Sequence, residues 1–71
     1  MERVVLARWE SQRGKDWIEV YEQSPHGCGY QGRGCGGWMG NVTREEAVAY
    51  IQQRVERGGF CSQKTPMKKV V

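Results

Sequence analysis

Residues 43–58 carry every local signal of an amphipathic α-helix. Thr43 is a favourable N-cap, and Glu46 three residues later completes a capping box. Arg57 in the expected last turn and Gly58 after it are typical of a helix C-terminus. The apolar residues of the segment recur at helical spacing and form one stripe: Ala47, Val48, Ile51 and Val55. A helix with a single apolar stripe has to cover another element, so the rest of the chain must supply one.

The element predicted to lie under this helix is a small antiparallel sheet. Residues 3–10 contain a run of consecutive apolar residues, which is typical of a strand. Residues 17–22 alternate in polarity, with Ile18 and Val20 on the face that the helix covers. A polar loop joins these two strands as a hairpin. Residues 38–42 are expected to add a short third strand.

The last segment, residues 61–71, is expected to be either a further strand through residues 67–71 or a basic extension. The predicted fold class is therefore α+β: a small antiparallel sheet of three to four strands in the order β-β-(β)-α-(β), with one capped helix on one face. A chain of 71 residues has room for one such domain, residues 1–71, with a modest core.

Hydropathy indicates a protein that stays out of the membrane. No apolar run approaches the roughly 20 residues that span a bilayer. The N-terminus lacks the apolar region of a secretory signal. Three cysteines leave at least one thiol unpaired, which fits a reducing compartment. We therefore expect a cytoplasmic location.

Residues 24–37 differ in kind, because they contain Pro25 and six of the ten glycines of the chain. This density of glycine predicts an irregular Gly-rich connection. The segment matches neither the dinucleotide fingerprint nor the phosphate-binding loop. Tyr30, Arg33 and the nearby Trp38 are nevertheless residues that stack on a base or hold a phosphate. A connection without a ligand, a protein contact and a nucleotide site all remain open for this segment.

A metal site is the next possibility. His26, Cys28, Cys35 and Cys61 together have the composition of a Cys₃His zinc centre. The spacing lacks the usual C-x₂₋₄-C knuckle, so zinc is the lesser alternative and no cofactor is expected. The competing interpretation is three free thiols and a surface histidine.

Catalysis finds little support in the sequence. Cys28 or Cys35 beside His26 would form a nucleophile and base, but no third group is in view to orient them. The acidic pair Glu45 and Glu46 is explained by helix capping. A chain this short also has few side chains to spare for a deep cavity. We predict that the protein is not an enzyme.

The sheet face away from the helix is predicted to be aromatic. Trp9, Trp17 and Tyr21 come from adjacent strands, and Arg8 lies next to them in sequence. A single helix cannot cover both faces of a sheet. Bare aromatic surface usually marks an interface, unless the tail or the Gly-rich segment folds back over it.

These observations favour a non-enzymatic binding protein that acts through a protein–protein interface, with a homodimer as one form of it. Small proteins without a catalytic constellation are common on phages and mobile elements, where they inhibit host enzymes or defence complexes. The alternative is a nucleotide- or nucleic-acid-binding module, with phosphate contacts from Lys64, Lys68 and Lys69; the net charge of +3 permits it without demanding it. The expected contact residues are Arg8, Trp9, Trp17, Tyr21, Tyr30, Arg33, Trp38 and Lys64.

Overall fold

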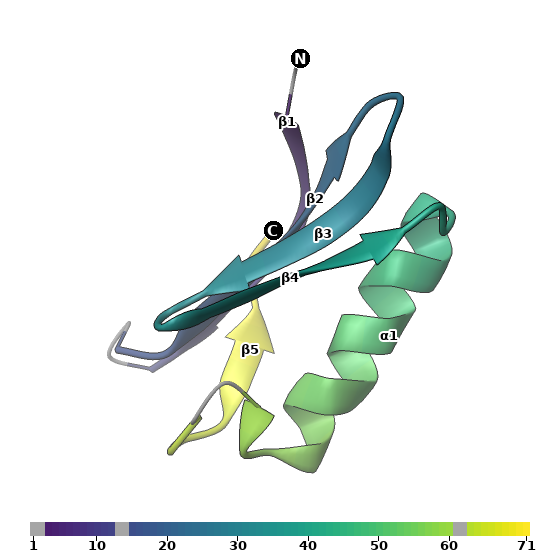
Figure 1. The fold of residues 1–71 in the computed structure, drawn as a ribbon. Coiled ribbons are helices and arrows are strands. Elements are labelled where there is room, and N and C mark those ends of the chain that lie inside the picture. Colours follow the sequence, from purple (N-terminus) through teal and green to yellow (C-terminus); the bar gives the residue numbers. More distant parts are fainter. Residues whose placement is uncertain (1–2, 13–14, 61–62) are drawn as a thin grey trace.

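The computed structural model describes residues 3–12, 15–60 and 63–71. The elements follow one another as β1 (Arg3–Ser11), β2 (Trp17–Gln23), β3 (Gly27–Gly32), β4 (Cys35–Gly40), α1 (Arg44–Arg57) and β5 (Met67–Lys69). The strands form one antiparallel sheet in the order β4-β3-β2-β1-β5, and α1 lies across one face of it (Figure 1). The predicted α+β class is confirmed, with five strands in place of three to four.

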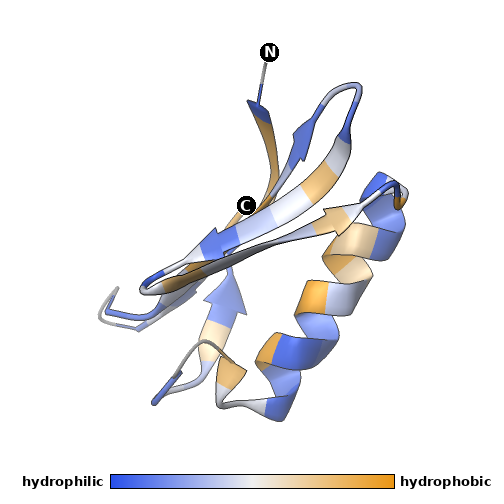
Figure 2. Ribbon diagram, viewed as in Figure 1, coloured by the Kyte–Doolittle hydropathy of each residue, from blue (hydrophilic) through white to orange (hydrophobic). Residues whose placement is uncertain are grey.

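The helix begins and ends where its local signals indicate. The Thr43 hydroxyl accepts a hydrogen bond from the Glu46 amide at 3.0 Å, and the Glu46 carboxylate accepts one from the Thr43 amide at 3.0 Å. Gly58 follows the last turn with a φ of 80°. The apolar side of α1 faces the sheet (Figure 2). Its buried residues are Ala47, Ile51 and Val55, and Val48 is half-buried.

The predicted first hairpin is also confirmed. β1 and β2 pair from Arg3 opposite Gln23 to Glu10 opposite Trp17. A register irregularity between Val5 and Ala7 shifts the first residues of β1 relative to the rest of the strand. Beyond this irregularity the inward positions form most of the sheet side of the core: Ala7, Trp9, Ile18 and Val20 are all buried.

The Gly-rich segment is regular, and the expectation of an irregular connection over residues 24–37 was wrong. Within it, β3 and β4 form a second hairpin closed by a turn at Arg33 and Gly34, whose φ of 76° suits glycine. The glycines inside the strands make room for aromatic rings. A Cβ on Gly29 would lie 2.7 Å from the Tyr21 hydroxyl, and one on Gly37 would lie 2.7 Å from the Tyr30 ring. Rings lying on glycine backbone compensate for the weak strand preference of glycine.

The tail provides the fifth strand. β5 pairs with β1, placing Met67 opposite Ser11 and Lys69 opposite Trp9. Of the two alternatives for residues 61–71, the last strand is therefore the correct one for residues 67–69. The carboxylate of Asp16 accepts hydrogen bonds from the backbone amides of Lys64 at 3.1 Å and Thr65 at 3.3 Å, which hold the segment before β5.

Across the described part of the chain, no helix has the length and apolar character needed to cross a membrane.

Candidate functional site

The face of the sheet opposite α1 is left without a covering layer by the described residues (Figure 1). The Gly-rich segment and the tail, which were the two candidates to cover it, instead extend the sheet sideways as β3, β4 and β5. We call this surface the open face. The side chains considered on it are Arg3, Val5, Arg8, Glu10, Trp17, Glu19, Tyr21, Gln31, Trp38 and Lys68.

Two aromatic rings meet over the middle of the second hairpin. The ring centroids of Tyr21 and Trp38 are 6.5 Å apart and the planes are tilted by 42°. Both rings lie close to Gly29, where a Cβ would be 2.8 Å from the Trp38 ring. Trp38 is 50% exposed, so half of a tryptophan surface faces solvent at the sheet edge. Large exposed aromatic surface of this kind is costly to hydrate and gains from a partner.

Arginine side chains lie over the other rings of the open face. The Arg3 guanidinium carbon is 4.0 Å from the Tyr21 ring centroid, and Arg3 Nη1 donates to Gln31 Oε1 at 3.2 Å. The Arg8 guanidinium carbon is 4.7 Å from the Trp17 ring centroid. These cation–π contacts hold the long arginine side chains against the sheet and leave the rings half-buried.

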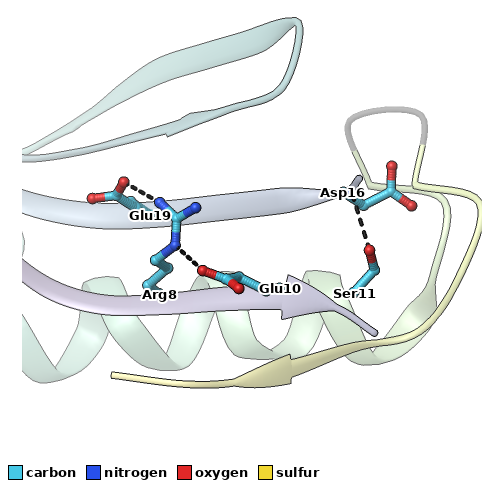
Figure 3. Close-up of polar contacts among 5 residues, drawn as sticks. All are labelled: Arg8, Glu10, Ser11, Asp16 and Glu19. Carbon is cyan, nitrogen blue, oxygen red and sulfur yellow. Dashed lines mark hydrogen bonds and ion pairs between the residues drawn. The ribbon is translucent and has the colours of Figure 1, made fainter. Parts of the chain in front are cut away.

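Ion pairs fix the centre of the open face. Arg8 Nε donates to Glu10 at 2.5 Å, and Arg8 Nη1 donates to Glu19 (Figure 3). The hydrogen bond with Glu10 is the main cause that raises the pKa of Arg8. Arg8 thus forms ion pairs with two carboxylates. Lys68 lies opposite Glu10 in the strand register, so two positive and two negative side chains meet at the centre of the face, and Arg3 adds a positive charge at one end.

The structure brings together four of the eight predicted contact residues: Arg8, Trp17, Tyr21 and Trp38 lie on the open face. Trp9 was assigned to the wrong face. It is fully buried against α1, where its Nε1 donates to Gln52 Oε1 at 2.6 Å. The signal for this was present in the sequence. Arg8 and Glu10 flank Trp9, and charged residues on both sides indicate that the residue between them points inward.

Tyr30, Arg33 and Lys64 do not join the site. Tyr30 lies on the α1 side of the sheet, with its ring centroid 5.5 Å from that of Phe60. Arg33 donates to the carbonyl of Lys15 at 2.8 Å, which ties the β3–β4 turn to the first loop. The predicted clamp of Tyr30, Arg33 and Trp38 therefore does not form, because the two aromatic residues lie on opposite faces.

Lys64 contributes its backbone amide to Asp16. Lys68 and Lys69 are neighbours in β5 and project to opposite faces of the sheet. The three tail lysines thus do not form one basic patch with the aromatic residues.

The cysteines are not arranged for catalysis. Cys28 is buried, its Sγ donates to the carbonyl of Val42 at 3.8 Å, and burial raises the pKa of the thiol. A thiol of this kind is a poor nucleophile. His26 is exposed in the β2–β3 turn.

Cys35 is disulfide-bonded, so the expectation of three free thiols was wrong at this position. Cys61 lies outside the described residues. A disulfide at Cys35 removes one thiolate from the predicted Cys₃His set, and no cluster of three or more potential metal ligands occurs among the described residues. Disulfides are typical of oxidising compartments, so the cysteines no longer support a cytoplasmic location.

The open face also contains residues that the sequence did not single out, chiefly Arg3, Val5 and Gln31. Gln31 lies opposite Glu19 in the β2–β3 pair, so it shares the face of Glu19 and Tyr21. This placement could be predicted only once β3 was recognised as a strand. Arg3 and Val5 lie before the register irregularity in β1, which strict alternation does not anticipate.

No protein-family model matches the chain, and the comparisons with curated proteins and with solved structures gave no significant match.

Proposed function

We propose that this protein is a non-enzymatic binding domain that contacts a partner protein through the open face. The observation that carries the proposal is a sheet surface with Trp17, Tyr21 and Trp38, left bare by the described residues. Tryptophan, tyrosine and arginine are the residues that contribute most to binding energy at protein interfaces. The same surface would serve an inhibitor that occupies the surface of a larger enzyme or complex.

The order already present on this face supports the proposal. Cation–π contacts and the Arg8 ion pairs hold the polar side chains in place before any partner arrives. Side chains that are fixed in the free protein lose less conformational entropy on binding. The rings also stand on strands, which position them more rigidly than loops would.

Charge favours a protein over a nucleic acid as the partner. A nucleic-acid surface needs a continuous positive path for the phosphates, and binding then weakens steeply with salt. On the open face, Arg3, Arg8 and Lys68 alternate with the carboxylates of Glu10 and Glu19, so the positive charges form no continuous path. Mixed charges around exposed aromatic rings are instead typical of protein interfaces.

Affinity purification from the source cells, at low and at high salt, tests the proposal. The bait is the full chain, and the matching variant carries Trp38→Ser with Arg3→Glu, two exposed positions of the open face. The control carries Gln53→Ser with Lys15→Glu, two exposed positions elsewhere. Circular dichroism first establishes that all three proteins are folded.

We expect one protein to be retained by the wild-type chain and by the control at both salt concentrations, and to be lost from the open-face variant. If the retained protein is a second copy of this chain, light scattering will show a dimer that the same variant converts to monomer. Retention that nuclease or high salt abolishes would instead support the nucleic-acid alternative. If the open-face variant retained the partner protein as well as the control does, the proposal would be contradicted.

A further inference from the structure

The second surface of interest is a groove between the edge strand β4 and α1, on the helix side of the sheet. The groove has a volume of about 550 Å³, within the range of peptide and small-molecule sites. It exists because α1 packs chiefly against β1, β2 and β3, which leaves β4 extending past the helix. Its apolar lining includes Tyr30, Met39, Val42, Ala47 and Tyr50, and Trp38, at the edge of the open face, also borders it.

Strand β4 is an edge without the usual protection. Edge strands expose alternate backbone amides and carbonyls, and proteins normally shield them with charges, proline or short length. The other edge of this sheet, β5, follows these rules, because it has three residues of which two are lysines. In contrast, β4 has six residues with no charge and no proline. Gly36 and Gly37 in its middle also allow another backbone to approach closely.

The helix side of the groove changes charge along its length. Glu46, Tyr50, Arg54 and Arg57 recur at helical spacing and form one stripe beside the buried face of α1. Glu46 lines the groove near Val42. Arg54 and Arg57 line a second hollow of about 510 Å³ with Cys35 and Phe60, and Tyr30 lines both hollows, so the two adjoin along α1. Arg54 contacts the rings of Tyr50 and Phe60, and neither arginine forms an ion pair within residues 3–12, 15–60 and 63–71.

We propose that this groove binds an extended peptide segment of a partner as an added strand on β4. The peptide carries apolar side chains at alternate positions, which enter the groove, and a carboxylate at the Arg54 and Arg57 end. Backbone pairing with the edge strand provides affinity, and the groove and the arginine pair provide specificity. The groove and the open face lie on opposite sides of the sheet and share Trp38 at the β4 edge, and the proposal does not depend on the function assigned to the open face.

A second copy of the chain fits the groove less well than a peptide does. If two β4 strands paired, the helix-side positions offered by the incoming strand would be Cys35, Gly37 and Met39. Gly37 has no side chain, so the centre of the groove would stay empty. A peptide with a larger apolar residue at that position fills it.

The test selects from a displayed library of random octapeptides with the purified full chain as target, and then measures binding of the enriched peptide by isothermal titration calorimetry. We expect alternating apolar positions and one acidic position. Arg54→Glu, at an exposed site, should weaken binding about tenfold, which corresponds to one charge-assisted hydrogen bond. The control Gln53→Glu also introduces a glutamate, one residue away and off the stripe, and should leave the affinity for the peptide unchanged.

Two further measurements make the site assignment specific. Amide hydrogen exchange should slow in β4 when the peptide is added, while the β5 edge stays as it was. Synthetic peptides ending in a free carboxylate or in an amide will distinguish a chain terminus from an acidic side chain as the group that Arg54 binds.

Several results would overturn the proposal: no enriched sequence, equal weakening by Arg54→Glu and Gln53→Glu, or self-association through β4 in place of peptide binding. An enriched peptide that binds the Arg54→Glu variant normally but not an Arg3→Glu variant, whose change lies on the open face and outside the groove, would also overturn it. That last result would place the peptide on the open face, and would therefore support the proposed function while excluding the groove.

Discussion

At the scale of single residues, Trp9 and Trp38 show how the same side chain serves opposite purposes in this protein. Trp9 is fully buried and its indole N–H is bonded to Gln52, so it belongs to the core. Trp38 is half exposed and rests on glycine backbone with no such bond among the described contacts. The first residue therefore contributes to folding, and the second is available to a partner.

We expect Trp9→Phe to lower the free energy of unfolding by about 1–3 kcal/mol, because it leaves a cavity and removes the hydrogen bond to Gln52. The matched substitution Trp38→Phe should change that free energy by less than about 0.5 kcal/mol, since the ring is half exposed. Urea denaturation of the two variants measures both values. Similar losses from both substitutions would mean that the two tryptophans have been assigned to the wrong roles.

Asp16 makes the stability of the protein depend on pH. Its carboxylate accepts hydrogen bonds from the Lys64 amide, which is the main cause, and from the amide and hydroxyl of Thr65, and these bonds lower its pKa in the folded state. A lowered folded-state pKa gives stabilisation that is complete above the unfolded value, about 3.9, and that is lost as the pH falls through the folded value.

The wild-type chain should therefore be more stable than Asp16→Asn at neutral pH, and the difference should shrink as the pH falls below about 4. Thermal unfolding of both proteins over a pH series measures this. A difference that stays constant down to about pH 2 would show that the charge of Asp16 has no part in the effect.

At the scale of elements, the glycines of β4 provide a prediction with adjacent positions as test and control. A Cβ on Gly37 would lie 2.7 Å from the Tyr30 ring, whereas one on Gly36 would have its nearest contact at 3.4 Å, with the Tyr30 carbonyl. We expect Gly37→Ala to destabilise the protein by about 1–3 kcal/mol, because the ring has to move. Gly36→Ala should be neutral to within about 0.5 kcal/mol. Chemical denaturation distinguishes the two outcomes, and equal effects would contradict the packing of Tyr30 on Gly37.

The same strands mark the limit of what could be predicted from the sequence. Helix α1 and the β1–β2 hairpin were predictable because capping, spacing and alternation are local signals that agree with each other. The strand predicted over residues 38–42 overlaps β4 only at 38–40. Strand β3 and the first half of β4 were not predicted, since glycine disfavours strands and only the distant rings of Tyr21 and Tyr30 make the hairpin favourable. The open face was predicted in part. Trp17 and Tyr21 alternate with Ile18 and Val20, but Trp38 could be added only once β4 was known.

At the scale of the whole molecule, one helix divides the sheet into a covered face and an open face, and its packing on the three central strands β1, β2 and β3 leaves the groove beside β4. Each of these surfaces follows from having a single helix for five strands. A larger protein would have a second helix on the open face. Here the two uncovered surfaces are the places where the protein can contact another molecule.

Removal of residues 67–71 tests how far the tail belongs to the fold. The truncated chain loses Met67 from the edge of the core and the bond from the Val70 amide to the Arg8 carbonyl at 2.7 Å. We expect a loss of about 1–3 kcal/mol in the free energy of unfolding. Substitution of Lys68 and Lys69 by Ala keeps the strand and should cost less than about 0.5 kcal/mol. If the truncation proved neutral, β5 would not contribute to stability in solution.

The pairing of β5 with β1 has a consequence for how the protein is made. The outer edge of β1 is paired by β5, which comes after the other strands and the helix in sequence. The two hairpins and α1 involve close neighbours in sequence and can form early, whereas closing the β1–β5 pair requires a loop of nearly the full chain length. The outer edge of β1 is therefore expected to be paired after the two hairpins and α1 have formed.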